Sequence, residues 1–139
     1  MKSDSSAIFN PEIFAGLSTL EVNKLLISVS DSSTKRRRIC LHSSKSSTLH
    51  LMLIAIGPNH LIPAHSTNTE GSIYYMIHHG SIILECPKKS IHYTLKKEKL
   101  IAAKLERTEV RVIKNPNNSP AIYWEITQGP HNPDSTIWK

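Results

Sequence analysis

Apolar residues recur at nearly helical spacing in only one part of the chain, between residues 19 and 29. One side of such a helix would carry Leu20, Val22, Leu25, Leu26 and Val29. Just before them, Ser18 and Glu21 have the spacing of a capping box, in which each side chain bonds the other residue's backbone N–H. The pattern therefore predicts a helix over about residues 19–29 whose apolar stripe packs on another element.

After this segment the apolar runs are short or alternating, and turn residues such as Gly57-Pro58-Asn59 and His79-Gly80 separate them. The runs that fit strands are Arg37–His42, Thr48–Ile56, His60–Pro63, Ile73–Ile77, Ser81–Glu85, Ile91–Leu95, Leu100–Ala103, Val110–Lys114 and Ala121–Thr127. Many short strands at close spacing are typical of an all-β sandwich or barrel. Several runs, notably Leu49–Ile56 and Ile73–Ile77, are apolar on both faces, so we expect a helix or a second subunit to cover their outer face.

The length of 139 residues indicates one domain that is large enough to bury its own core. We expect an N-terminal arm and helix over residues 1–34 and a β-barrel over residues 35–139. Asp31–Thr34 should end the helix. The apolar residues of the arm that are spaced to lie across a core are Ile8, Phe9, Ile13, Phe14 and Leu17.

Cys40 and Cys86 are the only cysteines and lie far apart, which predicts free, buried thiols in a reducing compartment. No stretch of about 18 apolar residues occurs, and the first residues lead into no apolar run. We therefore expect neither a signal peptide nor a membrane span, and a soluble cytoplasmic protein.

The formal net charge is +6, and the basic residues form clusters at Lys35–Arg38, Lys88-Lys89 and Lys96–Lys99. Such clusters bind phosphates, nucleic acids or acidic partners, although the two lysine clusters also fit an ordinary solvated surface. They do not alternate with exposed aromatic residues in one stretch, so nucleic-acid binding is the least favoured function. Along a strand, Arg36 and Arg38 would share one face, where their guanidinium groups suit a phosphate or carboxylate. The alternative is a basic edge strand that discourages pairing with another chain.

The stretch from Ile62 to Glu70 carries the strongest signal of chemistry. His65 and Glu70 lie five residues apart and meet at one metal ion if the chain between them bends back. An imidazole with a carboxylate suits Zn, Fe, Ni or Mn. Because two protein ligands make a weak site, His60 or His50 would have to complete it. For both of these histidines, the alternative is a surface or hydrogen-bonded side chain.

The order of these features also carries a family signal. The run Arg36–Arg38 ends in Leu41-His42, the strand Met52–Ile56 precedes Pro63-Ala64-His65, and residues 124–133 close the chain with Glu-Ile-x-x-Gly-Pro-x-x-Pro. This order resembles the WbuC family of cupin-fold proteins, found with surface-polysaccharide biosynthesis genes, over roughly residues 35–137. The resemblance implies a small jelly-roll barrel with a ligand pocket in its mouth, a divalent metal held there, and often a homodimer.

The family metal motif is a His-x-His pair, a Glu five residues later and a further His on a later strand. With His65 in the second position, Glu70 takes the Glu position and Pro63 replaces the first His; with His65 in the first position, Thr67 replaces the second His and the Glu register is lost. The later segment, residues 107–112, contains no histidine. The metal site is therefore predicted to be weakened or lost, and a rebuilt site of His65, Glu70 and either His50 or His60 is the alternative.

In that later segment, Glu109 is the nearest possible metal ligand. Its neighbours Val110 and Val112 are the apolar members of the alternation, so Glu109 is expected to point to solvent.

Several residues are easier to explain as ligand contacts than as catalysts. The candidates for ligand binding are Arg36, Arg38, His50, Tyr74 and Glu125. Tyr74, Tyr123 and Trp124 suit either stacking on a sugar ring or packing in the core. Glu125 would either reach the ligand or pair with an arginine. In a reaction without metal, His42 or His65 would carry the proton, because imidazole titrates near neutral pH.

Three functions follow. The first is a cupin that binds a carbohydrate-like ligand or a sugar nucleotide, linked to O-antigen or lipopolysaccharide biosynthesis, with a weak or absent metal site. The second is a metal-dependent sugar isomerase or epimerase that uses the rebuilt His/Glu site. The third is a non-enzymatic module that binds partners through its basic clusters. Fold resemblance alone does not decide between them.

Overall fold

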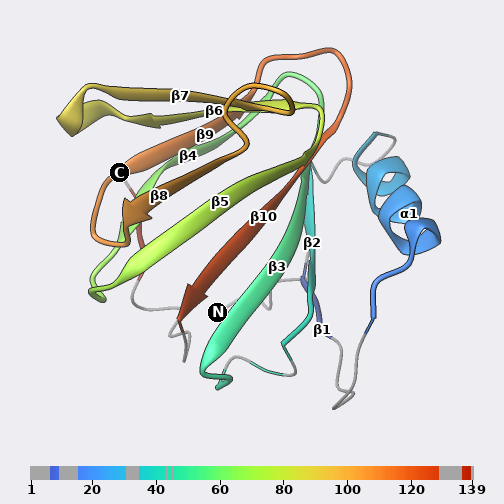
Figure 1. The fold of residues 1–139 in the computed structure, drawn as a ribbon, viewed down its shortest axis with the longest axis horizontal. Helices are drawn as coiled ribbons and strands as arrows, with labels where there is room; N and C mark the ends of the chain where they lie inside the picture. The colour runs from blue at the N-terminus through green and yellow to red at the C-terminus, as the bar shows by residue number, and fades with distance from the viewer. Residues whose placement is uncertain are drawn as a thin grey trace.

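The structure is a computed structural model that describes residues 7–9, 16–30, 35–42, 44, 46–128 and 136–138. These residues form one helix, α1 (Thr19–Ser30), a short 3₁₀ turn, η1 (Pro87–Lys89), and a set of β-strands (Figure 1). The strands are β1 (Ala7–Phe9), β2 (Arg36–Cys40), β3 (Leu49–Ile56), β4 (His60–Thr67), β5 (Ser72–His79), β6 (Ser81–Cys86), β7 (Ile91–Lys96), β8 (Ala102–Glu106), β9 (Arg111–Asn115), β10 (Ala121–Gln128) and β11 (Thr136–Trp138).

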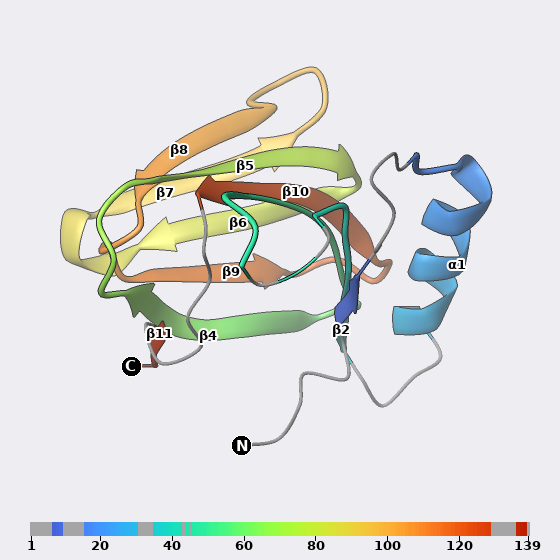
Figure 2. The ribbon, with the colours of Figure 1, turned by 90° about the horizontal axis from the view of Figure 1, so that it is seen from below.

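The strands form two sheets that lie face to face, with α1 beside β2 on the outside (Figures 1 and 2). One sheet has the order β1-β2-β3-β10-β5-β8 and the other has the order β11-β4-β9-β6-β7. Neighbouring strands pair antiparallel, except that β1 lies parallel to β2. The prediction of an all-β fold with an N-terminal helix is confirmed.

Strand β3 is apolar on both faces because both faces are covered. Ile54 and Ile56 face the other sheet and belong to the cluster of buried side chains between the sheets. Leu53 and Ala55 face outward and pack in a second cluster that includes Leu25 from α1. Full burial of an aliphatic side chain of this size stabilises a fold by about 1.5–3 kcal/mol. The helix is thus the predicted cover of the outer face.

The start of α1 follows the predicted capping box. The Ser18 hydroxyl accepts from the Glu21 N–H at 3.2 Å, and the Glu21 carboxylate accepts from the Ser18 N–H at 3.2 Å. The helix continues to Ser30, one residue past the predicted end. The residues expected to end it, Asp31–Thr34, lie outside the described residues. So do Ile13 and Phe14 of the arm and the closing segment from Gly129 to Ser135.

Strand β4 is longer than predicted, because it continues past Pro63 to Thr67. Its pairing with β9 shifts register between Ile62 and His65, which is a β-bulge or similar irregularity. A bulge tolerates Pro63, since proline has no N–H to donate to the neighbouring strand. The segment around His65 is therefore extended sheet rather than a bend. Strand β8 is also displaced, starting at Ala102 instead of Leu100.

The turn between β5 and β6 depends on a glycine. Gly80 has a φ of 73°, in the left-handed region that residues with a Cβ rarely adopt. A Cβ there would also come within 3.3 Å of the Pro120 carbonyl oxygen. The predicted break at His79-Gly80 is confirmed.

The two cysteines, Cys40 and Cys86, are buried and are not joined in a disulfide. The single described helix is too short to cross a membrane.

The contact between α1 and β3 generates a stability prediction. Leu25 is 3% exposed and Ile27 is 61% exposed, two residues apart on the same helix. Leu25→Ala should lower the free energy of unfolding by about 2–5 kcal/mol, because it opens a cavity under the helix. Ile27→Ala is the matched control and should change stability by no more than about 0.5 kcal/mol. Urea denaturation measures both variants, and equal losses would show that α1 does not pack as described.

Candidate functional site

The inner face of the first sheet carries a group of polar side chains. Residues directly opposite each other in an antiparallel pair point to the same face. Arg38 and Tyr123 are both opposite Ile54, and Glu125 is opposite both Met52 and Tyr75. Since Met52, Ile54 and Tyr75 belong to the cluster between the sheets, these polar residues face inward with them.

On the second sheet, His65 of β4 lies directly opposite Arg111 of β9. Both are buried, and the Arg111 side chain is only 2% exposed. Arg111, Ile113 and Asn115 are the buried members of β9, whereas Val112 is half-buried. The alternation predicted for this segment is thus reversed: the strand turns a guanidinium group inward and a valine outward.

Glu109 also differs from the expectation that it points to solvent. It lies in the turn before β9, its side chain is only 18% exposed, and it is 3.9 Å from the Lys89 ammonium. The prediction failed because the residue belongs to a turn, where the two-residue period of a strand does not apply.

Arg111 is held by hydrogen bonds to one side chain and two carbonyl oxygens. Its Nε donates to the Tyr75 hydroxyl at 2.7 Å, and its Nη1 donates to the carbonyl oxygens of Arg107 at 3.0 Å and Glu109 at 3.2 Å. Burial acts to lower the pKa of Arg111, but the neighbouring Tyr75 and Glu125 raise it, and the net shift is upward. A full positive charge therefore sits between the sheets.

His65 is poised as a neutral imidazole. Burial lowers its pKa, and the Arg111 charge lowers it further, while the hydrogen bond to Pro63 and the Glu125 carboxylate act in the opposite direction. Its Nδ1 lies 2.8 Å from the Pro63 carbonyl oxygen. A carbonyl oxygen only accepts, so Nδ1 carries the proton and Nε2 keeps a lone pair. The imidazole also lies 5.0 Å from the ring of Trp138 on β11.

Two tyrosines and an acid complete the group. Tyr75 and Tyr123 are fully buried, with ring centroids 6.0 Å apart, and burial raises the pKa of each well above its usual value. The Tyr123 hydroxyl has no hydrogen-bond partner among the described residues. Glu125 is close enough to influence the pKa of His65, of both tyrosines and of Arg111. Glu125 therefore faces the group, and Tyr123 leaves a buried polar atom to be satisfied.

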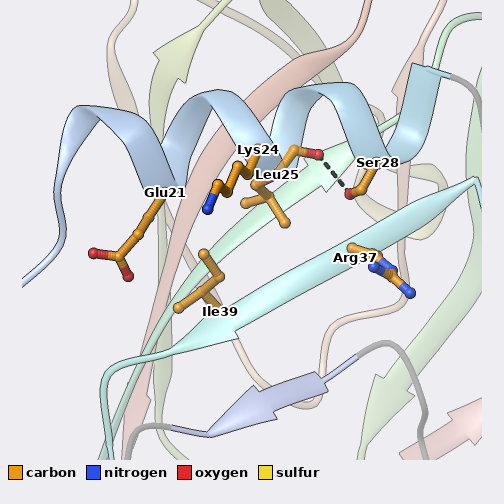
Figure 3. A pocket seen from close by; sticks show the side chains of 6 residues that line it. All are labelled: Glu21, Lys24, Leu25, Ser28, Arg37 and Ile39. Carbon is orange, nitrogen blue, oxygen red and sulfur yellow. Dashed lines mark hydrogen bonds between the residues drawn. The ribbon is translucent and has the colours of Figure 1, made fainter.

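The arginines of β2 divide between two faces, as the alternation predicts. Arg36 and Arg38 both influence the pKa of Tyr123, and the Arg36 guanidinium lies 5.6 Å from the centre of the Trp138 ring. Arg37 points the other way, into a small pocket between α1 and β2 that it shares with Lys24, Leu25 and Ile39 (Figure 3). Arg37 thus has no part in the group between the sheets.

The other predicted residues are placed as follows. His50 is buried and stacks on His42, with ring centroids 4.0 Å apart, and the His42 Nδ1 accepts from the Leu51 N–H at 3.2 Å. Tyr74 is 47% exposed and faces away from the group, because its neighbour Tyr75 faces inward.

The remaining two metal candidates do not gather around His65. His60 begins the strand on which His65 lies, and five residues of extended chain span roughly 15 Å. Glu70 is exposed beyond the end of that strand. In the described part of the chain, no three side chains of His, Cys, Asp or Glu are grouped so as to hold a metal ion. Within these residues, the side chains around His65 do not form a donor set that fits a metal ion.

No family model matches the sequence, and no curated protein matches it either. Solved structures do match. The cupin domain of an XRE-family transcriptional regulator from Enterobacter cloacae aligns with 70% of this chain and 100% of its own, with 14% identity and a TM-score of 0.57. The fold is that of the cupins.

Two other solved structures that match this chain are described as a polyketide cyclase and as an RmlC-like cupin. The polyketide cyclase RemF from Streptomyces resistomycificus aligns with 72% of this chain and 68% of its own, with 14% identity and a TM-score of 0.59. An RmlC-like cupin from Desulfovibrio desulfuricans aligns with 69% of this chain and 85% of its own, with 10% identity and a TM-score of 0.54. Since an enzyme and a regulator share the fold, these matches show the fold and no activity.

Sequence reasoning missed Arg111 and Tyr75, whereas Tyr123, predicted either to stack on a sugar or to pack in the core, is buried between the sheets. A signal for Arg111 was present, because Arg111, Ile113 and Asn115 are spaced two apart and would share a face. Choosing that face over the one with Val110 and Val112 required the pairing of β9 with β4.

The burial of His65 generates a prediction about pH. Its pKa in the folded protein lies below the unfolded value of 6.5, so the unfolded chain binds the proton more readily. Stability should therefore fall as the pH drops below about 6.5 and continues through the lower folded pKa. His65→Gln should flatten this part of the stability profile, measured by urea denaturation between pH 7.5 and 5. His79→Gln, at an exposed position, is the matched control and should keep the wild-type slope. A wild-type slope in His65→Gln would contradict the placement of His65.

Proposed function

We propose that the protein binds a small carbohydrate derivative with an acidic group, such as a sugar acid, a sugar phosphate or a sugar nucleotide, between its two sheets. The observation that carries this proposal is the Arg111 guanidinium, buried to 2% exposure on the inner face and aligned by the Tyr75 hydroxyl. A buried cation is costly unless it is paired, and a guanidinium suits the two oxygens of a carboxylate or phosphate.

The charge balance around Arg111 supports an anionic ligand. Arg107 is also buried, and its pKa is lowered first by burial and then by the Arg111 charge. Glu125 is the acid that offsets this repulsion, acting on both arginines. Arg36 and Arg38 add further positive charge near Tyr123. An anion bound among these groups would relieve their mutual repulsion.

The groups next to this charge suit a polyhydroxylated molecule. The unprotonated His65 Nε2 can accept a hydrogen bond from a ligand hydroxyl. The Tyr123 hydroxyl has no partner among the described residues and can also bond to a ligand. The Trp138 ring beside His65 offers an apolar surface for a sugar ring. The resemblance to WbuC proteins adds the setting of this proposal: a cytoplasmic homodimer, linked to surface-polysaccharide biosynthesis, whose metal site has been lost.

A second candidate is a metal-independent isomerase or epimerase acting on the same class of ligand. One observation favours it: a neutral His65 with an unprotonated Nε2 lies opposite a fixed cation. The imidazole would take a proton from a carbon next to a carbonyl or carboxylate, and the Arg111 guanidinium would stabilise the oxyanion that forms. The same imidazolium would return the proton.

The binding proposal predicts ligand-dependent stabilisation. In a screen of sugar acids, sugar phosphates, sugar nucleotides and neutral sugars, acidic members should raise the melting temperature and neutral sugars should not. A ligand at one hundred times its Kd stabilises by about 2.7 kcal/mol, which corresponds to roughly 10 °C for a chain of this size. Arg38→Gln should reduce the shift, whereas Arg37→Gln, on the opposite face, should keep it. Stabilisation that is the same in both variants, or that is absent throughout, would refute the proposal.

The enzymatic candidate predicts proton exchange. A ligand identified by this screen, incubated with the protein in D₂O, should exchange the hydrogen next to its carbonyl or carboxylate if His65 is a base. NMR would detect the exchange, and His65→Gln should abolish it at a ligand concentration that saturates the variant, even though the ligand binds the variant more weakly. Binding of the ligand without any exchange would contradict the isomerase hypothesis and would support ligand binding alone.

A further inference from the structure

His65 and Arg111 are the basis of a more specific assignment. They are directly opposite residues of β4 and β9, and both are buried. Opposite residues in an antiparallel pair have Cβ atoms about 4.5–5.5 Å apart. Their polar groups therefore face one ligand together, and the ligand must offer complementary groups on neighbouring atoms.

The hydrogen bonds within the protein decide what each side chain still offers. The His65 Nδ1–H donates to the Pro63 carbonyl oxygen, so Nε2 is left as an acceptor. In Arg111, Nε donates to Tyr75 and Nη1 donates to two carbonyl oxygens. Among the described residues, Nη2 has no such partner. The pair therefore presents one cationic donor beside one neutral acceptor.

We propose that His65 and Arg111 form a metal-free, two-point site for a hydroxy acid. The ligand's carboxylate binds the Arg111 guanidinium, and the hydroxyl on the adjacent carbon donates to the His65 Nε2. This assignment rests on the proposed function and deepens it, since it names the part of the ligand that the protein recognises. The buried Tyr123 hydroxyl, unpartnered among the described residues, independently indicates that a polar group of a ligand belongs between the sheets.

The same pair explains why this site needs no metal ion. A divalent cation on the His65 Nε2 would lie beside the guanidinium opposite it, and like charges repel strongly in a buried site. Glu70, the carboxylate of the predicted metal pair, is exposed beyond the end of β4, and Glu125 already offsets the charge of the arginines. The fixed guanidinium supplies the positive charge that a bound metal ion would otherwise supply. It therefore binds the carboxylate of the hydroxy acid directly.

The test uses three probes that differ in the groups they carry, each titrated once with EDTA and once without it. D-Gluconate has a carboxylate with an adjacent hydroxyl, hexanoate has the carboxylate alone, and D-sorbitol has hydroxyls alone. Isothermal titration of the full-length wild-type protein should show gluconate binding at least tenfold more tightly than either of the others. Equal affinity for gluconate and hexanoate, or binding of gluconate that EDTA abolishes, would overturn the assignment.

Variants and a spectroscopic readout separate the two contacts. His65→Ala should reduce gluconate affinity to that of hexanoate and leave hexanoate binding unchanged. Arg111→Lys keeps the charge but loses the planar donor group, and should weaken both acids. Because Arg111→Lys risks misfolding, the wild-type protein provides a second measurement. The ¹⁵N resonance of the His65 Nε2, assigned with His65→Ala, should move with gluconate and stay in place with hexanoate and sorbitol.

The two levels of proposal fail in different ways. If the three probes do not bind but a sugar phosphate or sugar nucleotide stabilises the protein in an Arg38-dependent way, the proposed function stands and the hydroxy-acid site is wrong. If the His65 resonance does not move with bound gluconate, the site is wrong as well. If no acidic ligand binds at all, both proposals are wrong.

Discussion

The two-residue period of antiparallel strands is the constraint on which both the core and the candidate site depend. Each strand turns alternate side chains toward the opposite sheet, and the register between strands decides which residues meet there. A shift of one residue in β9 would bring Val112 inward and expose Arg111. The inward position of Arg111, opposite His65 and bonded to Tyr75 of the other sheet, therefore depends on the same pairing that places Ile113 in the core.

A buried guanidinium is an unusual centre for such a fold, and its surroundings explain how it is tolerated. Two carbonyl oxygens and a tyrosine hydroxyl replace part of the water that it loses, and Glu125 supplies nearby negative charge. Buried ion pairs seldom stabilise a protein more than apolar packing would, and this supports the proposal that Arg111 recognises a ligand. The fold is shared by an enzyme and by a regulator domain, which means that the function must be argued from these side chains.

The two faces of the first sheet around β2 and β3 have different surroundings, with α1 on one side and the second sheet on the other. The outer face of β3 is closed by α1, and Arg37 on that side lies against the helix. On the inner face of the same sheet, Arg36 and Arg38 of β2 and Glu125 of β10 point toward the second sheet. Neighbouring residues of one strand, such as Arg37 and Arg38 of β2, thus point to opposite faces and form natural control pairs for experiments.

The sequence by itself determined the fold class, the helix with its capping box and most of the strands, because these follow from local periodicity and turn residues. It also determined that Arg36 and Arg38 share a face, since alternation along one strand is a local property. Only the tertiary structure decided that β4 continues past Pro63, that Tyr74 faces outward and Tyr75 inward, and that Arg111 rather than Val112 points between the sheets. Those choices depend on which strands pair and in which register, and pairing joins residues as far apart as His65 and Arg111, which no local pattern relates.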